Sequence, residues 1–467
     1  MCFCLGFDVL GKLKMWSAPV FVCFLYVSMS VEGLRFSGNV DIEATLNAKE
    51  LIQYWQYPFE EYNVLTDDGY ILTVFRIPHG RVNDISESPK PVVFLQHGLL
   101  VDAANWYQNL PHNSLAFLLA DAGYDVWLGN SRGTVWSKKH LSLSPRLNKF
   151  WAFSVSQTLS IKSQLLFGVE NRRNRHDLSL GSSSSPPALL LYKLSYDHMA
   201  KYDLPAFINF ALQKTGQEQV YYIAHSQGTT MAFLAFSTNP HLAAKIKLFV
   251  ALAPVATIKH ARTPLAKLSL LSDFQIKILF GEKDFLPKTY FGSIVASRFC
   301  SQNAFAPICS NLLFIVGGFN ENNLNLDSCE GTEQLKKSYF IFQSRIDVYA
   351  AYAPAGTSVQ NIIHWKQALT GGKLQAFDYG QRENQIYYNQ ATPPEYDVTL
   401  MNVSTAVWNG GEDWLSGPMD VDALIPKIKN LIFHEFIPEW NHLDFLFGLD
   451  APEKVYYKIL DLLKNYP

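Results

Sequence analysis

The sequence carries little charge, and the two signs balance. Lys and Arg together number 39 and Asp and Glu 41, so the formal net charge is −2 and only 17% of the residues are charged. The chain therefore lacks the overall positive field that would hold a nucleic acid backbone. Disordered, collagen-like and coiled-coil chains are also excluded, because 48% of the 467 residues are hydrophobic and 14% are aromatic, which is typical of a globular protein with a large core.

Long apolar runs are also scarce. A short uncharged apolar run follows Met15, with Lys12 and Lys14 just before it. This arrangement is typical of a secretory signal peptide with small residues suited to cleavage near 30–33, and a signal anchor that stays attached is the alternative. No later stretch reaches about 18 uncharged apolar residues. We therefore expect residues 1–33 to be an N-terminal extension and signal peptide, and the mature chain to enter the secretory pathway without a transmembrane span.

Cysteine is rare, and only three of the six cysteines lie beyond the expected cleavage site. An oxidising compartment permits a disulfide, and we expect one between Cys300 and Cys309, which would close a small loop. Cys329 is then left as an odd thiol. Asn402 begins the only N-x-S/T sequon, so it is a candidate glycosylation site. Because one sequon gives only weak support to a mannose-based lysosomal address, secretion and lysosomal delivery both stay open.

Strand-like apolar runs alternate with helix-like patterns along much of the chain. This rhythm predicts an α/β domain with a mainly parallel sheet, whose first part spans 34–256. From 257 to 397 the rhythm gives way to irregular turns and glycine pairs, which we interpret as an inserted cap. The sheet resumes over 398–467, which ends in a helix. The expected strands cover residues 92–95, 124–128, 219–224, 246–252, 405–408 and 431–434.

Two serines compete for the position of a catalytic nucleophile, which needs a strand, a tight turn between small residues and then a helix. Residues 129–133, Gly-Asn-Ser-Arg-Gly, match the G-x-S-x-G pattern in full, but little helical signal follows Ser131. Residues 224–228, Ala-His-Ser-Gln-Gly, begin with alanine, yet they lie between a strand-like and a helix-like run. We predict Ser226 as the nucleophile, because alanine adds only one methyl group where a small residue is needed.

A serine nucleophile of this kind also needs two N–H donors for the oxyanion of the tetrahedral intermediate and a histidine oriented by a carboxylate. Gln227 follows the nucleophile, and Leu99 follows the strand at 92–95 and a His-Gly pair, so their backbone N–H groups are the expected donors. An ordinary turn is the alternative interpretation of that pair. Asp413 and His442 follow the last two strands in the required order. Competing late acids and histidines are Glu412, Asp420, Asp444, His434 and His364.

With these residues identified, the chain resembles the acid lipase family. Matching segments run from about 40 to 455 and include Leu-Gln-His-Gly-Leu at 95–99, His-Ser-Gln-Gly-Thr at 225–229, Trp-Asn-Gly-Gly at 408–411 and Pro-Glu-Trp-Asn-His-Leu-Asp-Phe at 438–445. The resemblance implies an α/β-hydrolase fold with a cap, in which 129–133 is a loop motif. It also implies the triad, oxyanion donors and cap disulfide formed by Ser226, Asp413, His442, Leu99, Gln227, Cys300 and Cys309.

The same resemblance implies the chemistry. The expected reaction is hydrolysis of acylglycerols or cholesteryl esters through an acyl-enzyme, with acid preference and without a metal or cofactor. The expected partner is neutral lipid at a lipid–water interface, and we expect a monomer.

Two segments depart from the family pattern, 155–195 and 326–343. The first contains an arginine-rich run and four serines followed by two prolines, a composition typical of disorder. The second contains Cys329 and ends in Tyr-Phe-Ile-Phe-Gln, the translation expected of a pyrimidine-rich tract and a splice acceptor. We interpret one or both as retained intron or mispredicted coding sequence.

Three functions stay open at this level. The first is a secreted or lysosomal lipid ester hydrolase. The second is a non-catalytic lipid-binding relative that its two inserts have disabled. The third is an acyltransferase, which would pass the acyl group to an alcohol in preference to water.

Overall fold

The computed structural model describes residues 40–81, 89–154, 191–193, 195–300, 317 and 345–466. The expected signal peptide, Cys309 and the second insert lie outside these residues, as does most of the first insert.

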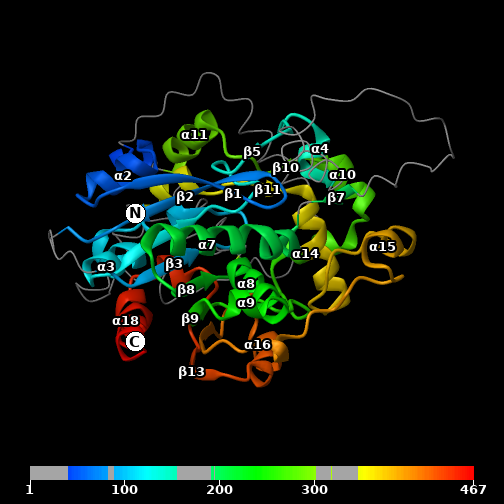
Figure 1. Ribbon diagram of the computed structural model, residues 1–467. Coiled ribbons are helices and arrows are strands. Elements are labelled where there is room, and N and C mark those ends of the chain that lie inside the picture. The colour runs from blue at the N-terminus through cyan, green and yellow to red at the C-terminus, as the bar shows by residue number, and fades with distance from the viewer. Residues whose placement is uncertain are drawn as a thin grey trace, which may run out of the picture.

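A nine-stranded sheet forms the centre of the described chain (Figure 1). Its main path has the order β1-β2-β4-β3-β8-β9-β12-β13, and β5 pairs with β2. The strands from β4 to β13 on this path run parallel, whereas β1, β2 and β5 pair antiparallel, so the prediction of a mainly parallel sheet is confirmed. The strands are β1 (Glu60–Leu65), β2 (Tyr70–Ile77), β3 (Val92–Gln96), β4 (Asp125–Gly129), β5 (Lys139–His140), β8 (Val220–His225), β9 (Ile246–Leu252), β12 (Thr405–Gly410) and β13 (Leu431–Ile437).

Helices cover both faces of this sheet. Successive side chains of a strand point to opposite faces, so a strand that is apolar throughout buries side chains on both. Leu95 of β3 packs in one apolar cluster, while its neighbour Phe94 packs in the other. The Leu95 side includes α2 (Ala48–Tyr54), α3 (Leu115–Asp121), α17 (Asp444–Phe447), η8 (Pro452–Tyr456) and α18 (Tyr457–Asn465). The Phe94 side includes α6 (Tyr196–His198), η4 (Met199–Asp203), α7 (Leu204–Thr215), α8 (Gln227–Thr238), α9 (Pro240–Ala243) and α16 (Pro418–Leu424).

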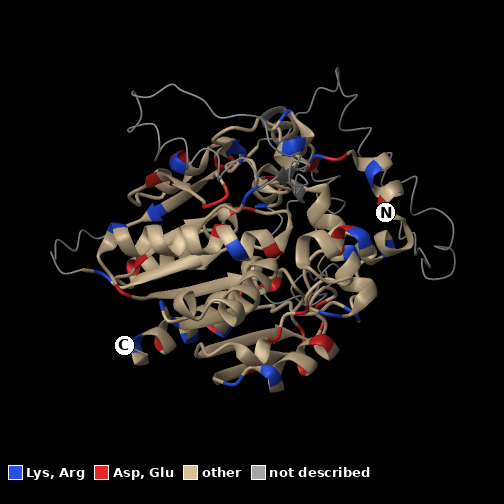
Figure 2. Ribbon diagram, turned by 45° about the vertical axis from the view of Figure 1, so that its right-hand side comes forward, with Lys and Arg blue, Asp and Glu red and all other residues tan. Residues whose placement is uncertain are grey.

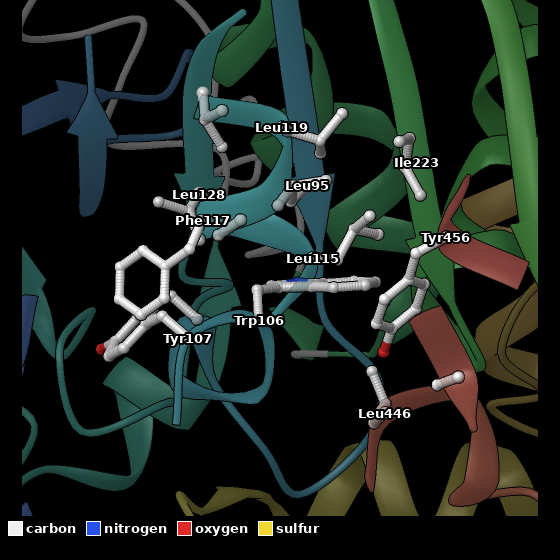
Figure 3. Packing of buried hydrophobic residues seen from close by; sticks show 14 of the residues in the cluster. Leu95, Trp106, Tyr107, Leu115, Phe117, Leu119, Leu128, Ile223, Leu446 and Tyr456 are labelled. Atoms are coloured by element: carbon white, nitrogen blue, oxygen red, sulfur yellow. The ribbon is translucent and has the colours of Figure 1, made fainter. Parts of the chain in front are cut away.

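Large aromatic side chains fill the Leu95 side. Figure 3 shows Trp106 beside Leu115 and Tyr456, residues from well-separated parts of the chain. All three are at most 1% exposed. The segment after β13 is thereby packed against the segment between β3 and β4, so Tyr456 is part of the same core.

Several elements between β9 and β12 lie outside the central sheet and form the region that we call the cap. Its described elements are η5 (Pro264–Leu270), α10 (Asp273–Phe280), β10 (Asp284–Phe285), α11 (Tyr290–Cys300), β11 (Thr357–Ser358), α14 (Val359–Gly371) and α15 (Gln381–Tyr388). The strands β10 and β11 pair with each other, and α10 and α14 share an apolar cluster around Ile276 and Ile363. Leu99 packs against this cluster, which therefore connects the cap to the end of β3.

The first insert differs from its prediction at one end. We expect disorder throughout 155–195, but Leu191–Lys193 form β7, which pairs antiparallel with β6 (Ala152–Ser154). The pairing of Ser154 with Leu191 brings the two ends of the intervening segment together. Leucine and tyrosine in this short run favour a strand over the disorder that the preceding serines and prolines indicate.

Basic and acidic residues are interspersed along the described chain (Figure 2). This distribution agrees with the balanced composition.

Candidate active site

Ser226 lies in the tight turn between β8 and α8, as the sequence predicts. Its backbone angles are φ 54° and ψ −125°, a strained conformation for a residue with a side chain. The turn is held because Ser226 N–H donates to Leu252 O at 3.1 Å and Thr229 N–H donates to Ser226 O at 2.8 Å. The strain is therefore imposed by the strand and helix on either side, which is the geometry of a nucleophile elbow.

Glycine is required at Gly228 in this turn and at Gly98 in the neighbouring turn after β3, because the two backbone segments approach closely. A Cβ at Gly228 would lie 2.7 Å from Gln96 O, and one at Gly98 would lie 2.9 Å from Ser226 Cβ. Ala224, which replaces the first glycine of the motif, is fully buried in the apolar cluster around Phe94. The extra methyl group is thus accommodated by packing.

His442 and Asp413 form a buried pair. His442 Nδ1 lies 2.8 Å from Asp413 Oδ2, and the two residues are 2% and 0% exposed. Asp413 Oδ1 accepts the backbone N–H groups of Leu415 at 2.8 Å and Ser416 at 2.7 Å. Because its other oxygen is held by the backbone, the carboxylate presents Oδ2 to the imidazole in one orientation.

The loops that carry this pair interlock through glycine. A Cβ at Gly410 would lie 2.1 Å from Trp440 O, and one at Gly411 would lie 2.2 Å from Pro438 O. The contact is closed by hydrogen bonds from Gly411 N–H to Ile437 O at 2.9 Å and from the next residue to Trp440 O at 3.0 Å. The two glycines therefore permit the approach of the loop that carries His442.

One cap residue also reaches the pair. Gly317 O accepts the N–H groups of Trp414 and His442, both at 3.2 Å. This carbonyl therefore ties together the segments that carry the carboxylate and the imidazole. The sequence analysis did not identify Gly317, since no sequence signal links it to residues so distant in the chain.

His225 is a further neighbour that the sequence analysis did not single out. Its Nε2 lies 2.8 Å from His442 O. A carbonyl only accepts, so Nε2 carries the proton. Complete burial lowers the pKa of His225 well below its usual value, and the neighbouring His442 lowers it further. His225 is thus a neutral donor that holds the His442 backbone, and it adds no second positive charge beside that imidazole.

The expected oxyanion donors lie at adjacent strand ends. β3 and β8 pair in parallel with Gln96 opposite Ala224, so the turns after them meet at one edge of the sheet. Gln227 begins α8, whose N-terminus favours negative charge. Within the described chain, the backbone N–H groups of Leu99 and Gln227 have no hydrogen-bond acceptor. Both are therefore available to an oxyanion.

The competing serine has a different environment. Ser131 is 1% exposed, its Oγ accepts from Gln96 Nε2 at 3.0 Å, and its N–H donates to His97 Nε2 at 3.1 Å. No helix follows it directly. The adjacent Arg132 is buried between Asp68 and Asp203, and each ion pair has a 2.6 Å contact. Gly129 is the last residue of β4, and residues 130–133 therefore form a loop whose polar groups make structural contacts.

The competing acids and histidines have other contacts. Glu412 is exposed, Asp420 accepts from Thr257 and His260, and Asp444 accepts from Asn441. His434 contacts Asn409 and His364 contacts Gln375 O. Among the described residues, no group of three or more potential ligands could hold a metal ion. The expected Cys300–Cys309 bond lies outside the residues whose side chains are described.

Comparisons with known proteins agree with this architecture. A model described as a partial alpha/beta-hydrolase lipase region matches residues 48–110, and one described as the alpha/beta hydrolase fold matches 91–449. Human lysosomal acid lipase/cholesteryl ester hydrolase is 48% identical, over 97% of this chain and 100% of its own length. Human lipase member K is 47% identical, over 97% and 99%. Rat gastric triacylglycerol lipase is 49% identical, over 90% and 92%.

Proposed function

The chain belongs to the acid lipase family of α/β hydrolases, and from this premise we propose that it hydrolyses acylglycerols or cholesteryl esters through an acyl-enzyme. As a member of that family it is a carboxylic ester hydrolase. The observation that carries the proposal is the strained Ser226 turn together with the buried 2.8 Å contact between His442 and Asp413.

In the proposed acylation step, Ser226 Oγ attacks the ester carbonyl carbon while His442 Nε2 takes the hydroxyl proton. Asp413 holds Nδ1–H and stabilises the imidazolium that forms. The tetrahedral intermediate collapses when His442 returns the proton to the leaving alcohol. Water then repeats the sequence on the acyl-enzyme, which releases the fatty acid and restores Ser226.

The oxyanion of both intermediates is assigned to the N–H groups of Leu99 and Gln227. Removal of one such donor typically lowers the rate by about 10²–10³-fold. Two observations support this assignment: among the described residues these N–H groups have no acceptor, and Gln227 lies at the N-terminus of α8.

The setting of the enzyme is part of the same proposal. We assign residues 1–33 to a signal peptide, a disulfide to Cys300 and Cys309, and a glycan to Asn402, in a monomer that is secreted or lysosomal and prefers acid. The names of the lysosomal acid lipase and gastric lipase relatives support the secretory route and the acid preference. In the described residues, no helix is both long and apolar enough to cross a membrane.

The experiment is labelling of the expressed chain with a fluorophosphonate, followed by mass spectrometry of the labelled peptide. We expect the label on Ser226. Labelling should be absent in a chain that is heated beforehand and in Ser226→Ala, and it should be retained in Ser131→Ala. Absence of label in the folded chain, beside a labelled variant without the inserts, would instead support the disabled lipid-binding relative. Transfer of the acyl group to an alcohol in preference to water would support the acyltransferase.

A further inference from the structure

The side chain of Gln227 is held by the cap. Its Oε1 accepts Asn361 Nδ2 and Trp365 Nε1, each at 2.7 Å. Its Nε2 lies 3.5 Å from Met199 Sδ. Two strong donors therefore fill both lone pairs of the amide oxygen of a residue that is only 2% exposed.

The two donors come from one face of α14. Asn361 and Trp365 are four residues apart, so their side chains lie one above the other and converge on one acceptor. Asn361 is fully buried, and its Nδ2 also donates to Thr357 Oγ1 at 3.1 Å. A rotation of the Gln227 side chain would take the acceptor away from buried Asn361 and partly buried Trp365, and an unsatisfied buried N–H costs about 1–3 kcal/mol.

The start of α14 is itself fixed. Ser358 Oγ accepts Asn361 N–H at 2.9 Å and caps the helix. Ser358 belongs to β11, which pairs with Asp284 and Phe285 of β10. Figure 1 shows α14 beside α10 in the cap, with α8 of the core nearby. The amide of Gln227 is therefore a direct polar link between the cap and the first residue of α8.

We infer that Asn361 and Trp365 are positioning residues for the oxyanion hole. This inference rests on the proposed function, in which the backbone N–H of Gln227 binds the oxyanion. The cap residues fix the Gln227 side chain, and the side chain fixes the first turn of α8 and hence the direction of that N–H. Neither residue needs to contact the substrate.

The inference predicts a loss in rate with little loss in binding. Acylation and deacylation both pass through an oxyanion, whereas the ground-state ester does not need the donor. Loss of a positioning bond should cost less than the 10²–10³-fold of a lost donor. We expect Trp365→Phe, which retains an aromatic ring and removes the N–H, to lower kcat by about tenfold and to change KM by less than about twofold.

The experiment measures kcat and KM on a water-soluble short-chain ester, so that lipid adsorption does not contribute. The variants are Trp365→Phe, Asn361→Ala, Gln227→Met and the double variant Trp365→Phe/Gln227→Met. In Gln227→Met the acceptor is gone, so adding Trp365→Phe should cost no further activity. Thr370→Ala, at an exposed position of α14, is the matched control and should retain the activity of the unmodified enzyme.

If Trp365 has a purely structural role, Trp365→Phe should lower kcat by the same factor in the unmodified enzyme and in Gln227→Met. That result would overturn the inference. Unchanged kcat in both Trp365→Phe and Asn361→Ala would also overturn it. Thermal unfolding of each variant identifies any that fail to fold. If either Trp365→Phe or Asn361→Ala does not fold, the kcat of the other one tests the inference. Failure of the proposed function is distinct, since the unmodified enzyme would then show neither turnover nor fluorophosphonate label on Ser226.

Discussion

The neighbours of Asp413 fix the orientation of its carboxylate toward His442. Its Oδ1 is held by two backbone N–H groups, which leaves Oδ2 for His442. We predict that Asp413→Asn lowers kcat by about 10³–10⁴-fold, because an amide that donates to Nδ1 stabilises the wrong imidazole tautomer. The measurement is steady-state hydrolysis of a soluble ester.

Asp420→Asn is the control for this prediction. Asp420 is also buried and follows the same strand, but it accepts from Thr257 and His260 rather than from His442. It should alter stability without a comparable loss of kcat. Equal losses of kcat in the two variants would remove Asp413 from the mechanism.

Gly98 sets the distance between the nucleophile and the expected oxyanion turn. A Cβ at this position would lie 2.9 Å from Ser226 Cβ and 3.2 Å from His225 Nδ1. We predict that Gly98→Ala displaces Ser226 and lowers kcat/KM by about 10²-fold, since small misplacements have effects of this size.

Gly371→Ala serves as the control for Gly98→Ala, because its Cβ would meet only Gln375 Nε2, at 3.7 Å. That variant should keep its activity. Full activity in Gly98→Ala would show that the two turns can separate without loss of the reaction geometry.

The residues of the candidate site were predictable where local pattern suffices. Ser226, Asp413 and His442 each follow a strand, and short-range signals mark such positions. His225, Gly317 and Asn361 were not predicted, because their roles depend on tertiary partners far away in the sequence, as in the bond between His225 and His442 O.

At the scale of elements, the loop after β12 depends on its two glycines. We predict that Gly411→Ala lowers the free energy of unfolding by about 3 kcal/mol, because its Cβ would lie 2.2 Å from Pro438 O, a backbone atom that cannot move alone. Urea denaturation of this variant and of Gly371→Ala measures the effect. Equal stability of the two would mean that the two loops can separate at little cost.

The strands were predictable to different degrees. The buried parallel strands appear in the sequence as short apolar runs, and β3, β8 and β9 lie within about one residue of their predicted bounds. The strands β1 and β2 were not predicted. β1 alternates between partly buried and exposed positions through most of its length and contains three polar residues in Glu60–Asn63, so its pattern resembles a loop.

At the scale of the whole molecule, one buried histidine couples stability to pH. His364 stacks on Tyr196, donates toward Gln375 O at 3.0 Å and faces Asp197 and His198 of α6. Burial lowers its pKa from 6.5 to about 4, although Asp197 acts in the opposite direction. The unfolded chain therefore binds a proton at this residue at a higher pH than the folded chain does.

We predict that the enzyme loses stability relative to His364→Gln as the pH falls from 6.5 to about 4, by about 3 kcal/mol in total. The difference should be constant above this window. Denaturation of both proteins at several pH values is the measurement. Parallel curves through the window would show that His364 does not titrate differently on folding.

The chain between β6 and β7 offers a test at the same scale. Ser154 and Leu191 are paired, so a two-residue turn can replace residues 155–190. We predict that this deletion raises the free energy of unfolding by about 2 kcal/mol, because a shorter loop costs less entropy to close, and that kcat/KM is unchanged. A deletion variant that fails to fold would show that the removed segment contributes to the core.

The placement of the sheet strands has a consequence for synthesis. β12 joins β9 only after the whole cap has been made, and Asp413 and His442 lie near the end of the chain. Since a ribosome delivers the N-terminal part first, the proposed nucleophile emerges long before its base. The proposed nucleophile therefore has no base until His442 has been synthesised, and a polypeptide that terminates between Ser226 and Asp413 lacks both of its proposed partners.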